Sequence, residues 1–401
     1  MSILKNNLFV SFYADDMRFF YSISKVIPFK SYFYSIFTSG IFYLLFKFKL
    51  PLNFIFNFKS NISLPASFED LISYEKTQNK FNTSHLITAS QNYIFLFDYI
   101  IKKKNIKYVY LSGDSRLIIK SAEYAAKFNS CSIIYFEQGP FGTTILDTKG
   151  VNANCSFRIV NFTEDLSSIK INKSKKVTWT KYFRISDLLF YNLLKYKSKY
   201  LFNDLPSFFN KKTNKIIKQK NNYILLILQV PKDANMILHS PNFSNHLDIL
   251  KWTFQNLPLG IDLVVREHPN FIGSYEKELY NFIKTNDNII SLDNSDLNTS
   301  INNSILVVVN NSTVGIEAIL QNKKLVVLGD CYYDKIKSVF KFENNKSNIL
   351  KKAINSKIDN KTGISFINYV LKNELIGFHF RDENLNISDE ILLRKIKNYY
   401  Y

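Results

Sequence analysis

Cysteine, glycine and proline are scarce in this sequence, and it contains no long apolar run without charge. Three cysteines, Cys131, Cys155 and Cys331, are scattered through 401 residues without C-x-x-C spacing. Their number and spacing argue against a disulfide framework and against a zinc site, and favour a reducing compartment. With only 11 Gly and 9 Pro, and with abundant Lys, Asn, Ile, Phe and Tyr, the composition is typical of an AT-biased genome and excludes few functions by itself.

The longest uncharged run that is mainly apolar is too short to span a bilayer. It covers residues 31–46, whereas about 20 residues are needed to cross the hydrocarbon core. We expect a core strand and helix there, and the aromatic and basic stretch around Lys49 keeps contact with a membrane surface open as an alternative. An apolar stretch at residues 8–13 is cut off by Asp15 and Asp16, so no secretory signal is predicted. We predict a cytoplasmic protein, with peripheral attachment to the inner face of a membrane as the alternative.

The formal net charge of +19 is the compositional feature that most needs a partner or an explanation. Three interpretations stay open: a lysine-rich solvated surface, the anionic face of a membrane, and a nucleic acid. The sequence has neither a zinc-finger spacing nor an aromatic RNA-binding motif, so we predict no nucleic-acid partner.

Strand and helix patterns alternate twice along the chain, and a chain of this length, 46% hydrophobic, can bury two cores. Residues 1–85 are the least legible. The first alternation is a β-α-β unit, which implies a parallel sheet. It consists of a helix at 86–104, a strand at 107–111, a helix at 115–128 and a strand at 132–136.

The second alternation follows a polar, basic stretch that includes residues 211–220 and is the best linker candidate. Its expected elements are strand 223–229, helix 245–255, strand 261–266, helix 274–285, a short strand near Ile289, strand 305–309, helix 313–320 and strand 324–328. Two tail segments, 366–371 and 387–397, have helical patterns. We therefore predict an α/β fold of two Rossmann-like domains that face a central cleft, with one boundary between residues 215 and 216.

In the second domain, the segment after strand 305–309 is suited to bind a nucleotide. The carboxyl ends of an open parallel sheet are where its ligands bind. Ser312 and Thr313 open a helix there, so backbone N–H groups, hydroxyls and the helix dipole can hold a phosphate. Glu317 lies one helical turn further on the same face, where its carboxylate can accept hydrogen bonds from ribose hydroxyls.

The end of strand 261–266 supplies a second polar segment. His268 can donate to a phosphate or to a leaving oxygen, Pro269 fixes the turn that presents it, and Arg266 adds permanent positive charge. The alternative is that Ser312 is an ordinary helix cap and His268 a hydrogen-bonded loop residue. The order of the two motifs, both at strand ends, favours a nucleotide site.

Three further strand ends carry candidate catalytic or acceptor residues. Asp233 follows the first strand of the second domain and can act as a general base or attack an anomeric carbon, although an aspartate there is more often a helix cap or turn former. In the first domain, Glu137 and Gln138 follow one buried strand, and Asp114 and Arg116 follow another. Glu137 is a plausible acid or base, and Asp114 can equally be the N-cap of the next helix, its more common role.

In this order, the motifs resemble the bacterial capsule-polysaccharide synthesis family, whose characterised members are retaining β-Kdo transferases that use CMP-Kdo. The motifs are Gly-Asp-x-Arg, Phe-Glu-x-Gly, Leu-Gln-Val-x-x-Asp, Arg-Glu-His-Pro and Asn-Ser-Thr-Val-Gly-x-Glu, and the resemblance covers about residues 107–334. It departs from the family at Glu137-Gln138-Gly139, where relatives often have an acidic pair or Glu-Glu-Gly. The resemblance implies a GT-B type glycosyltransferase, with an acceptor domain at 1–215 that includes the linker and a donor domain at 216–401 that includes the tail helices.

The resemblance also implies a mechanism and a division of the site. In the family, the aspartate of the Gln-x-x-x-Asp segment is the nucleophile of a double displacement, and it corresponds to Asp233; Glu137 and His268 complete the predicted catalytic set. The predicted CMP-binding residues are Arg266, His268, Pro269, Ser312, Thr313 and Glu317. The predicted acceptor-side residues are Asp114, Arg116 and Gln138. We expect no metal and no cofactor, because CMP carries a single phosphate and no Asp-x-Asp motif is present.

The implied activity is transfer of Kdo from CMP-Kdo to a cell-surface polysaccharide, as in capsule, O-antigen or lipopolysaccharide biosynthesis, or to its lipid-linked precursor. Three alternatives stay open. The same pocket could serve CMP-sialic acid or CDP-glycerol, or the chain could be a non-catalytic basic protein that docks on anionic lipid or nucleic acid. The expected partners are a CMP-sugar, a glycan acceptor and the inner-membrane surface. The chain ends without a helix-stop signal, so a longer enzyme is also an open expectation.

Overall fold

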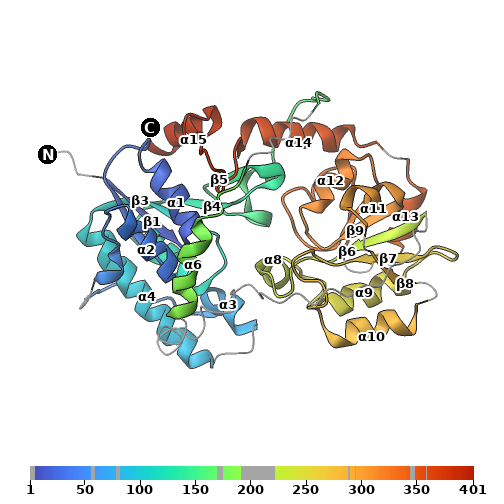
Figure 1. The fold of residues 1–401 in the computed structure, drawn as a ribbon, viewed down its shortest axis with the longest axis horizontal. Coiled ribbons are helices and arrows are strands. Elements are labelled where there is room, and N and C mark those ends of the chain that lie inside the picture. The colour runs from blue at the N-terminus through green and yellow to red at the C-terminus, as the bar shows by residue number, and fades with distance from the viewer. Residues whose placement is uncertain are drawn as a thin grey trace. The chain divides into compact units, whose positions relative to one another are not determined.

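Two six-stranded sheets, each covered by helices, form the part of the chain that this computed structural model describes (Figure 1). The described residues are 5–55, 59–77, 82–168, 175–190, 222–287, 290–293, 295–343, 348–357 and 359–401. Each sheet belongs to one compact unit. Unit 1 comprises Met1–Val151, Ile169–Leu205 and Leu371–Tyr401, and unit 2 comprises Asn152–Ser168 and Pro206–Val370.

The sheet of unit 1 has the order β2-β1-β3-β4-β5-β12. Its strands are β1 (Asn6–Ser11), β2 (Ser31–Ser35), β3 (Ile106–Ser112), β4 (Ser132–Gln138), β5 (Thr144–Asp147) and β12 (Leu375–Ile376). The first four pair parallel with one another, and β5 pairs antiparallel with both β4 and β12. Every residue of β1 is buried, as expected for a parallel strand that is covered on both faces.

The helices of unit 1 are α1 (Ala14–Ile23), α2 (Thr38–Phe46), α3 (Glu69–Thr77), α4 (Thr83–Lys103), α5 (Leu117–Phe128), α6 (Thr180–Leu189) and α15 (Glu390–Tyr400). Short 3-10 turns lie at η1 (Leu52–Phe54) and η2 (Pro140–Gly142). Asn82 begins α4 with a standard cap, because its side-chain oxygen accepts from the Ser84 N–H at 3.0 Å. The described part of residues 1–85, the segment that was least legible from sequence, thus supplies β1, β2, α1, α2 and α3 of this unit.

The sheet of unit 2 has the order β8-β7-β6-β9-β10-β11, and every pair in it is parallel. Its strands are β6 (Tyr223–Ile227), β7 (Leu263–Arg266), β8 (Ile290–Leu292), β9 (Ser304–Val309), β10 (Leu325–Val327) and β11 (Val339–Lys341). The helices that follow them are α8 (Ala234–Leu238), α9 (His246–Gln255), α10 (Lys277–Thr285), α11 (Leu297–Asn303), α12 (Val314–Leu320), α13 (Ile349–Asn355) and α14 (Lys361–Asn373). Two further 3-10 turns, η3 (Asn152–Asn154) and η4 (Ser156–Arg158), belong to the same unit.

These units confirm the predicted fold class of two Rossmann-like domains, and the predicted β-α-β unit is β3-α5-β4. The run at residues 31–46 forms β2 and α2, as expected. Strand β6 ends at Ile227, two residues before the predicted end, because the chain turns at the Pro231 loop. The predicted linker at 211–220 lies outside the described residues. No helix within the described ranges combines the length and the apolar character needed to cross a bilayer.

The division into units differs from the single boundary that we predicted near residue 215. The C-terminal segment Leu371–Tyr401 belongs to unit 1, and Asn152–Ser168 belongs to unit 2. The physical reason is the apolar face of α15: Tyr400 is buried in the core of this unit against the ring of Tyr108, and its hydroxyl lies 2.9 Å from that of Tyr110 on β3. A hydrophobic stripe packs where it finds an apolar partner, whatever its place in the sequence.

Candidate nucleotide site

The strand order of unit 2 locates the candidate site at the carboxyl ends of its parallel strands. From β6 the chain builds outward through β7 to β8, and then returns to the other side of β6 as β9, β10 and β11. This reversal between β6 and β9 is a topological switch point, and in parallel sheets ligands bind outside the carboxyl ends of the strands there. Asp233 follows β6, His268 follows β7 and Ser312 follows β9, so the three predicted segments come from three adjacent strand ends.

The ends of β6 and β7 are tied together by one buried tyrosine, which sequence reasoning missed. The Tyr275 hydroxyl donates to the Gln229 carbonyl at 2.9 Å and accepts from the His268 N–H at 3.0 Å. The side chain of Gln229 is 7% exposed, and neither of its amide atoms has a partner among the described residues. Buried amides are normally hydrogen-bonded, so this one marks a site that a polar ligand or water can complete.

Asp233 occupies the N-cap position before α8, but its side chain makes no capping hydrogen bond within the described helix. Its backbone is extended, with ψ at 152°, and its carboxylate bonds none of the described N–H groups of that helix. Instead it accepts from the side-chain amide of Asn235 at 3.2 Å. Lys232 before it has a φ of 60°, so the turn holds a left-handed residue directly before the aspartate. The common role of an aspartate here, a helix cap, is therefore not the one this side chain fills.

His268 is half-buried, and burial lowers its pKa below the ordinary value. Its Nδ1 accepts from the Asn270 N–H at 3.3 Å, and its ring meets the edge of Phe271 at 5.6 Å. A neutral imidazole that accepts at Nδ1 carries its proton on Nε2. His268 is thus both the loop residue of our alternative and a side chain able to donate one hydrogen bond. Pro269, next to it, is exposed.

Arg266, the last residue of β7, is held by residues that follow β8 in the chain. Its Nη1 lies 2.6 Å from Asp293, 2.7 Å from the Ser295 carbonyl and 3.1 Å from the Ser300 hydroxyl. Burial acts to raise the pKa of Asp293, but hydrogen bonds from Ser295 and Ser300, with Arg266, outweigh it and hold that pKa below its usual range. This pair could not be predicted from the sequence, because a helix and a strand, α10 and β8, separate Asp293 from Arg266 along the chain.

Ser312 and Thr313 follow β9, as predicted, and α12 begins one residue later than predicted. Thr313 is the cap residue of α12, its side chain is exposed, and it makes no capping bond within the described helix. Ser312 Oγ accepts from the Val314 N–H at 3.3 Å. Glu317 is half-buried in the first turn, where burial raises its pKa and the charge of Arg266 opposes that effect.

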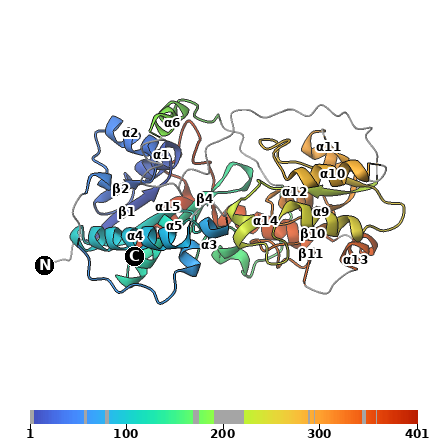
Figure 2. The same cartoon turned by 90° about the horizontal axis from the view of Figure 1, so that it is seen from below.

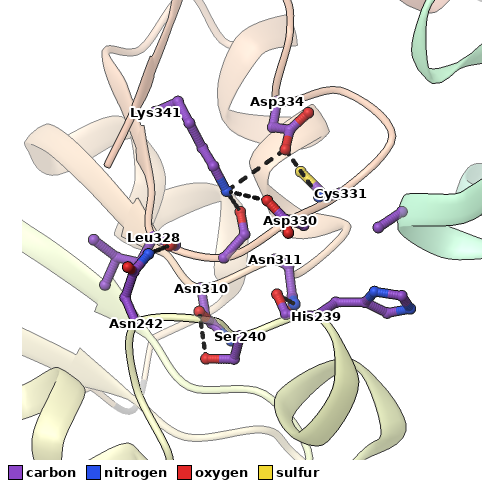
Figure 3. A network of polar contacts seen from close by, with 12 residues as sticks. His239, Ser240, Asn242, Asn310, Asn311, Leu328, Asp330, Cys331, Asp334 and Lys341 are labelled. Atoms are coloured by element: carbon purple, nitrogen blue, oxygen red, sulfur yellow. Dashed lines mark hydrogen bonds and ion pairs between the residues drawn. The ribbon is translucent and has the colours of Figure 1, made fainter. Parts of the chain in front are cut away.

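A network of amides joins this strand end to α8 (Figure 3). The Asn311 side-chain amide donates to the carbonyls of Asn235 at 2.9 Å and His239 at 3.0 Å, while its Oδ1 is buried without a partner among the described residues. The Asp330 N–H donates to the same His239 carbonyl at 2.7 Å. Figure 3 shows the His239 imidazole pointing away from these bonds. The network fixes α8, and with it Asp233, against the ends of β9 and β10.

A balanced ion cluster holds the loop after β10. Arg158 grips Asp334 with two nitrogens at 3.0 and 2.6 Å, and Lys341 reaches Asp330 at 2.8 Å and Asp334 at 3.5 Å. Two cations and two carboxylates neutralise each other, which is typical of a structural clamp. Neither here nor elsewhere among the described residues do three or more His, Cys, Asp or Glu side chains gather as a metal site would need.

The predicted acceptor residues lie at the carboxyl ends of β3 and β4, which are neighbours in the sheet of unit 1. Asp114 is buried, and its Oδ2 accepts from the Val151 N–H at 3.0 Å, so it holds a loop and does not cap α5. At the end of β4, Glu137 is half-buried and accepts from the N–H of Gln138 at 2.8 Å, and Gln138 is exposed.

The start of α5 is capped from another helix. Arg116 occupies its cap position without a capping bond in the described helix, and its guanidinium lies 4.1 Å from the ring centre of Tyr74. Glu75 of α3 supplies the missing acceptor, 3.0 Å from the Leu117 N–H. Arg116 is therefore held at this edge of the sheet by stacking on Tyr74. Asp114, the other predicted acceptor residue here, holds the loop at Val151.

The family model described as a capsule polysaccharide biosynthesis protein matches residues 172–339. Over these residues the chain is similar to that family. The match includes the ends of β6, β7 and β9 and stops short of the predicted acceptor residues, so it confirms the resemblance for the nucleotide side. Protein FixF of Sinorhizobium fredii (strain NBRC 101917 / NGR234) is 36% identical over 120 residues, which are 28% of this chain and 27% of FixF. The chain thus spans about a quarter of the length of that relative.

Solved structures of similar architecture are more distant. The β-Kdo 2,7 transferase of Thermosulfurimonas dismutans KpsC has a TM-score of 0.40 at 14% identity, covering 72% of this chain and 87% of that one. The S. aureus MnaA structure with UDP has a TM-score of 0.36 at 12% identity, covering 98% and 94%. Likenesses this weak carry no argument about the activity of this chain.

Proposed function

We propose that this protein is a retaining glycosyltransferase that moves Kdo from CMP-Kdo to a cell-surface polysaccharide or its lipid-linked precursor. The observation that carries the proposal is the switch point between β6 and β9, which the capsule-biosynthesis match covers and which Asp233 and Ser312 flank. A role in capsule polysaccharide biosynthesis is the level that the family match supports directly.

In this proposal the end of β9 and the His268 turn hold CMP. The backbone N–H groups and hydroxyls of Ser312 and Thr313 bind the single phosphate, and Nε2 of His268 donates a further hydrogen bond to it. Glu317 accepts from the ribose hydroxyls, and Pro269 shapes the turn. Because Arg266 is paired with Asp293 at 2.6 Å, its charge acts on the phosphate only at a distance.

The proposed chemistry is a double displacement at the anomeric carbon of Kdo. The Asp233 carboxylate forms a bond to that carbon while the bond to the phosphate oxygen breaks, and CMP leaves with the electron pair. An acceptor hydroxyl then displaces the aspartate and gives its proton to a base, the role we assign to Glu137. Two inversions return the original configuration, and Asp233 is regenerated as the carboxylate.

Intact-mass spectrometry after mixing with CMP-Kdo tests the nucleophile. The wild-type chain should gain the mass of one Kdo residue, located on Asp233 by peptide mapping. Asp233→Asn should form no adduct and lose transfer by roughly a thousandfold or more, yet bind CMP nearly as well. Glu278→Gln, an exposed carboxylate on α10, is the matched control and should behave as wild type. Turnover retained in Asp233→Asn would remove the aspartate from this role.

A donor panel separates the alternatives. CMP-sialic acid or CDP-glycerol turned over in preference to CMP-Kdo would keep the site and change the substrate. The net charge of +19 favours one rival of another class, a non-catalytic protein that docks on anionic polymers. That rival predicts steeply salt-dependent polymer binding, no protection of the chain by CMP and no turnover of any CMP-sugar.

A further inference from the structure

Unit 1 exposes several large apolar side chains on and just after two helices that pack together, α2 and α6, and the rings of Phe42 and Phe190 meet across them at 5.9 Å. The two helices pack against each other and lie side by side at one edge of the unit (Figure 2). We call this surface the aromatic patch. Its most exposed members are Phe42, Phe46, Phe48, Leu50, Tyr182 and Leu189. Single exposed apolar residues are ordinary on proteins, but a contiguous group marks an interaction site.

The helices that carry the patch are locked in place. The Asp187 carboxylate of α6 caps the start of α2, accepting from the Thr38 hydroxyl at 2.9 Å and from the Ser39 N–H at 2.7 Å. Aromatic rings join the same helices further along, with Phe46 and Phe183 at 5.9 Å between ring centres. The helices that carry the exposed side chains are therefore fixed to each other by specific contacts.

Phe48 is the clearest sign that the patch meets a partner. It follows α2 in a left-handed conformation, with φ at 53°, and its N–H donates to Leu45 while that of Lys49 donates to Leu44. This is the Schellman ending, in which glycine is the usual residue at that position. Instead the chain places a phenylalanine there and leaves it 98% exposed. Strain and apolar exposure at one residue point to a ligand that covers it.

The charge around the patch selects the partner. Lys47, Lys49 and Lys181 accompany the apolar side chains, and Lys47 lies over the Phe46 ring at 4.7 Å. Over residues 38–55 and 175–190, the only acidic residue is Asp187, which is buried at the cap. A second copy of this chain would bring the same positive charge to the contact and be repelled, since the net charge is +19. Aromatic side chains interleaved with lysines suit the anionic headgroups of a membrane.

We propose that the aromatic patch binds the anionic surface of a lipid bilayer, with Phe46, Phe48 and Leu50 entering the headgroup region and the lysines on the lipid phosphates. The helices lie on the membrane and do not cross it. This contact would hold the protein where a lipid-linked glycan is found. It does not depend on the transfer reaction proposed above, so vesicle binding and turnover can fail separately.

Trp179 makes the contact measurable, because it is half-exposed on the patch and packs against Tyr43. The sequence has only one other tryptophan, Trp252, so the variant Trp252→Phe leaves a single reporter. Vesicles of phosphatidylcholine with phosphatidylglycerol should shift its emission to shorter wavelength, and brominated lipid should quench it. Vesicles of phosphatidylcholine alone should bind much more weakly.

Variants then separate the apolar and the charged parts of the patch. Phe48→Ser should lower partitioning roughly tenfold, whereas Leu259→Ser, which removes a fully exposed leucine of unit 2, should leave it unchanged. Lys47→Gln with Lys49→Gln should lower binding to anionic vesicles roughly thirtyfold and flatten its salt dependence. Absent binding by the wild-type chain, equal losses in the Phe48 and Leu259 variants, or a dimer that sedimentation shows and Phe48→Ser dissolves, would each overturn the proposal.

Discussion

At the scale of single residues, the room around a backbone atom decides which side chains a strand end accepts. Gly315 opens α12 with its α-carbon against the ring of Tyr333, and an added Cβ would lie 2.8 Å from Cε2 of that ring. Tyr333 is fully buried, and its hydroxyl donates to the Ser312 carbonyl, so the ring has no free space to move into. The glycine therefore keeps the β9 loop in its place against β10.

Gly315→Ala should destabilise the chain by about 1–3 kcal/mol, because overpacking forces the loop or the ring to shift. The shift should also weaken CMP binding, since Ser312 belongs to the displaced segment. Urea unfolding and CMP titration measure the two effects. Thr313→Ala, at the same helix start but with an exposed side chain, is the control and should change stability by less than about 0.5 kcal/mol. Equal stability of both variants would show that Tyr333 can yield.

The same scale marks how far the sequence could predict the site. The position of Asp233, His268 and Ser312 after adjacent strands was predictable, because strand ends are recognisable as buried runs that stop in polar residues and parallel strands share their ligand edge. The contacts of Arg266 and Asp114 were not predictable, because their partners, Asp293 and the Val151 N–H, are distant along the chain. Gln229 and Tyr275 were missed, since no local pattern tells that a side chain is buried and unpaired.

At the scale of elements, α2 is followed by Phe48 in a left-handed conformation that side chains other than glycine disfavour. A left-handed residue costs an ordinary side chain about 1 kcal/mol relative to glycine. Phe48→Gly should therefore raise the free energy of unfolding by about that amount, even though it removes a side chain that we assign to membrane binding. A gain in stability together with a loss of vesicle binding is the expected pair of results.

Urea unfolding at neutral pH checks this prediction. Asn105→Gly is the matched control, because Asn105 also has a positive φ, of 47°, but asparagine tolerates that conformation. Its gain should be less than half of that in Phe48→Gly. A less stable Phe48→Gly would mean that the phenylalanine packs against the described core after all, and would weaken the argument from its exposure.

Elements were predictable where the periodicity of the sequence was clear. The pattern at residues 86–136 gave α4, β3, α5 and β4 nearly to the residue, because buried parallel strands are continuous apolar runs and α4 is long and amphipathic. Residues 1–85 resisted because aromatic residues there fit strand and helix alike. Short elements such as β12, which has two residues, carry too little pattern to be found.

At the scale of the whole molecule, the boundary between the units was not predictable from composition. Helix α15 is far from β1 and β3 in sequence, and the buried contacts of Tyr400 with Asn7 and Tyr110 show that it completes unit 1. Composition shifts mark linkers, whereas membership of a core depends on which apolar faces meet. The two units consequently have different sets of buried titratable groups, and they should respond differently to acid.

In unit 2, burial lowers the pKa of His246 to about 4, from the ordinary 6.5. Between these values the unfolded chain binds a proton that the folded chain does not, so the stability of unit 2 falls as the pH falls, by on the order of 3 kcal/mol. In unit 1, burial lowers the pKa of His379 to about 4, so this histidine also makes the folded unit less stable as the pH falls. Burial raises the pKa of Asp16 to about 6, from 3.8. Because the folded state binds this proton at a higher pH than the unfolded state does, Asp16 makes the folded unit more stable as the pH falls.

The two effects in unit 1 offset each other between pH 6 and 4, so acid should weaken unit 2 more than unit 1. The two tryptophans report on the units separately: Trp179 belongs to unit 1, and Trp252 packs against Phe243 and Phe342 in the core of unit 2. In variants that keep one tryptophan each, the fluorescence of that tryptophan gives the urea midpoint of its unit. From pH 7 to 5 the midpoint reported by Trp179 should change little, while the midpoint reported by Trp252 drops. His246→Gln should flatten only the Trp252 response. Midpoints that move together would mean that the units unfold as one body, and a larger drop at Trp179 would show that Asp16 does not offset His379.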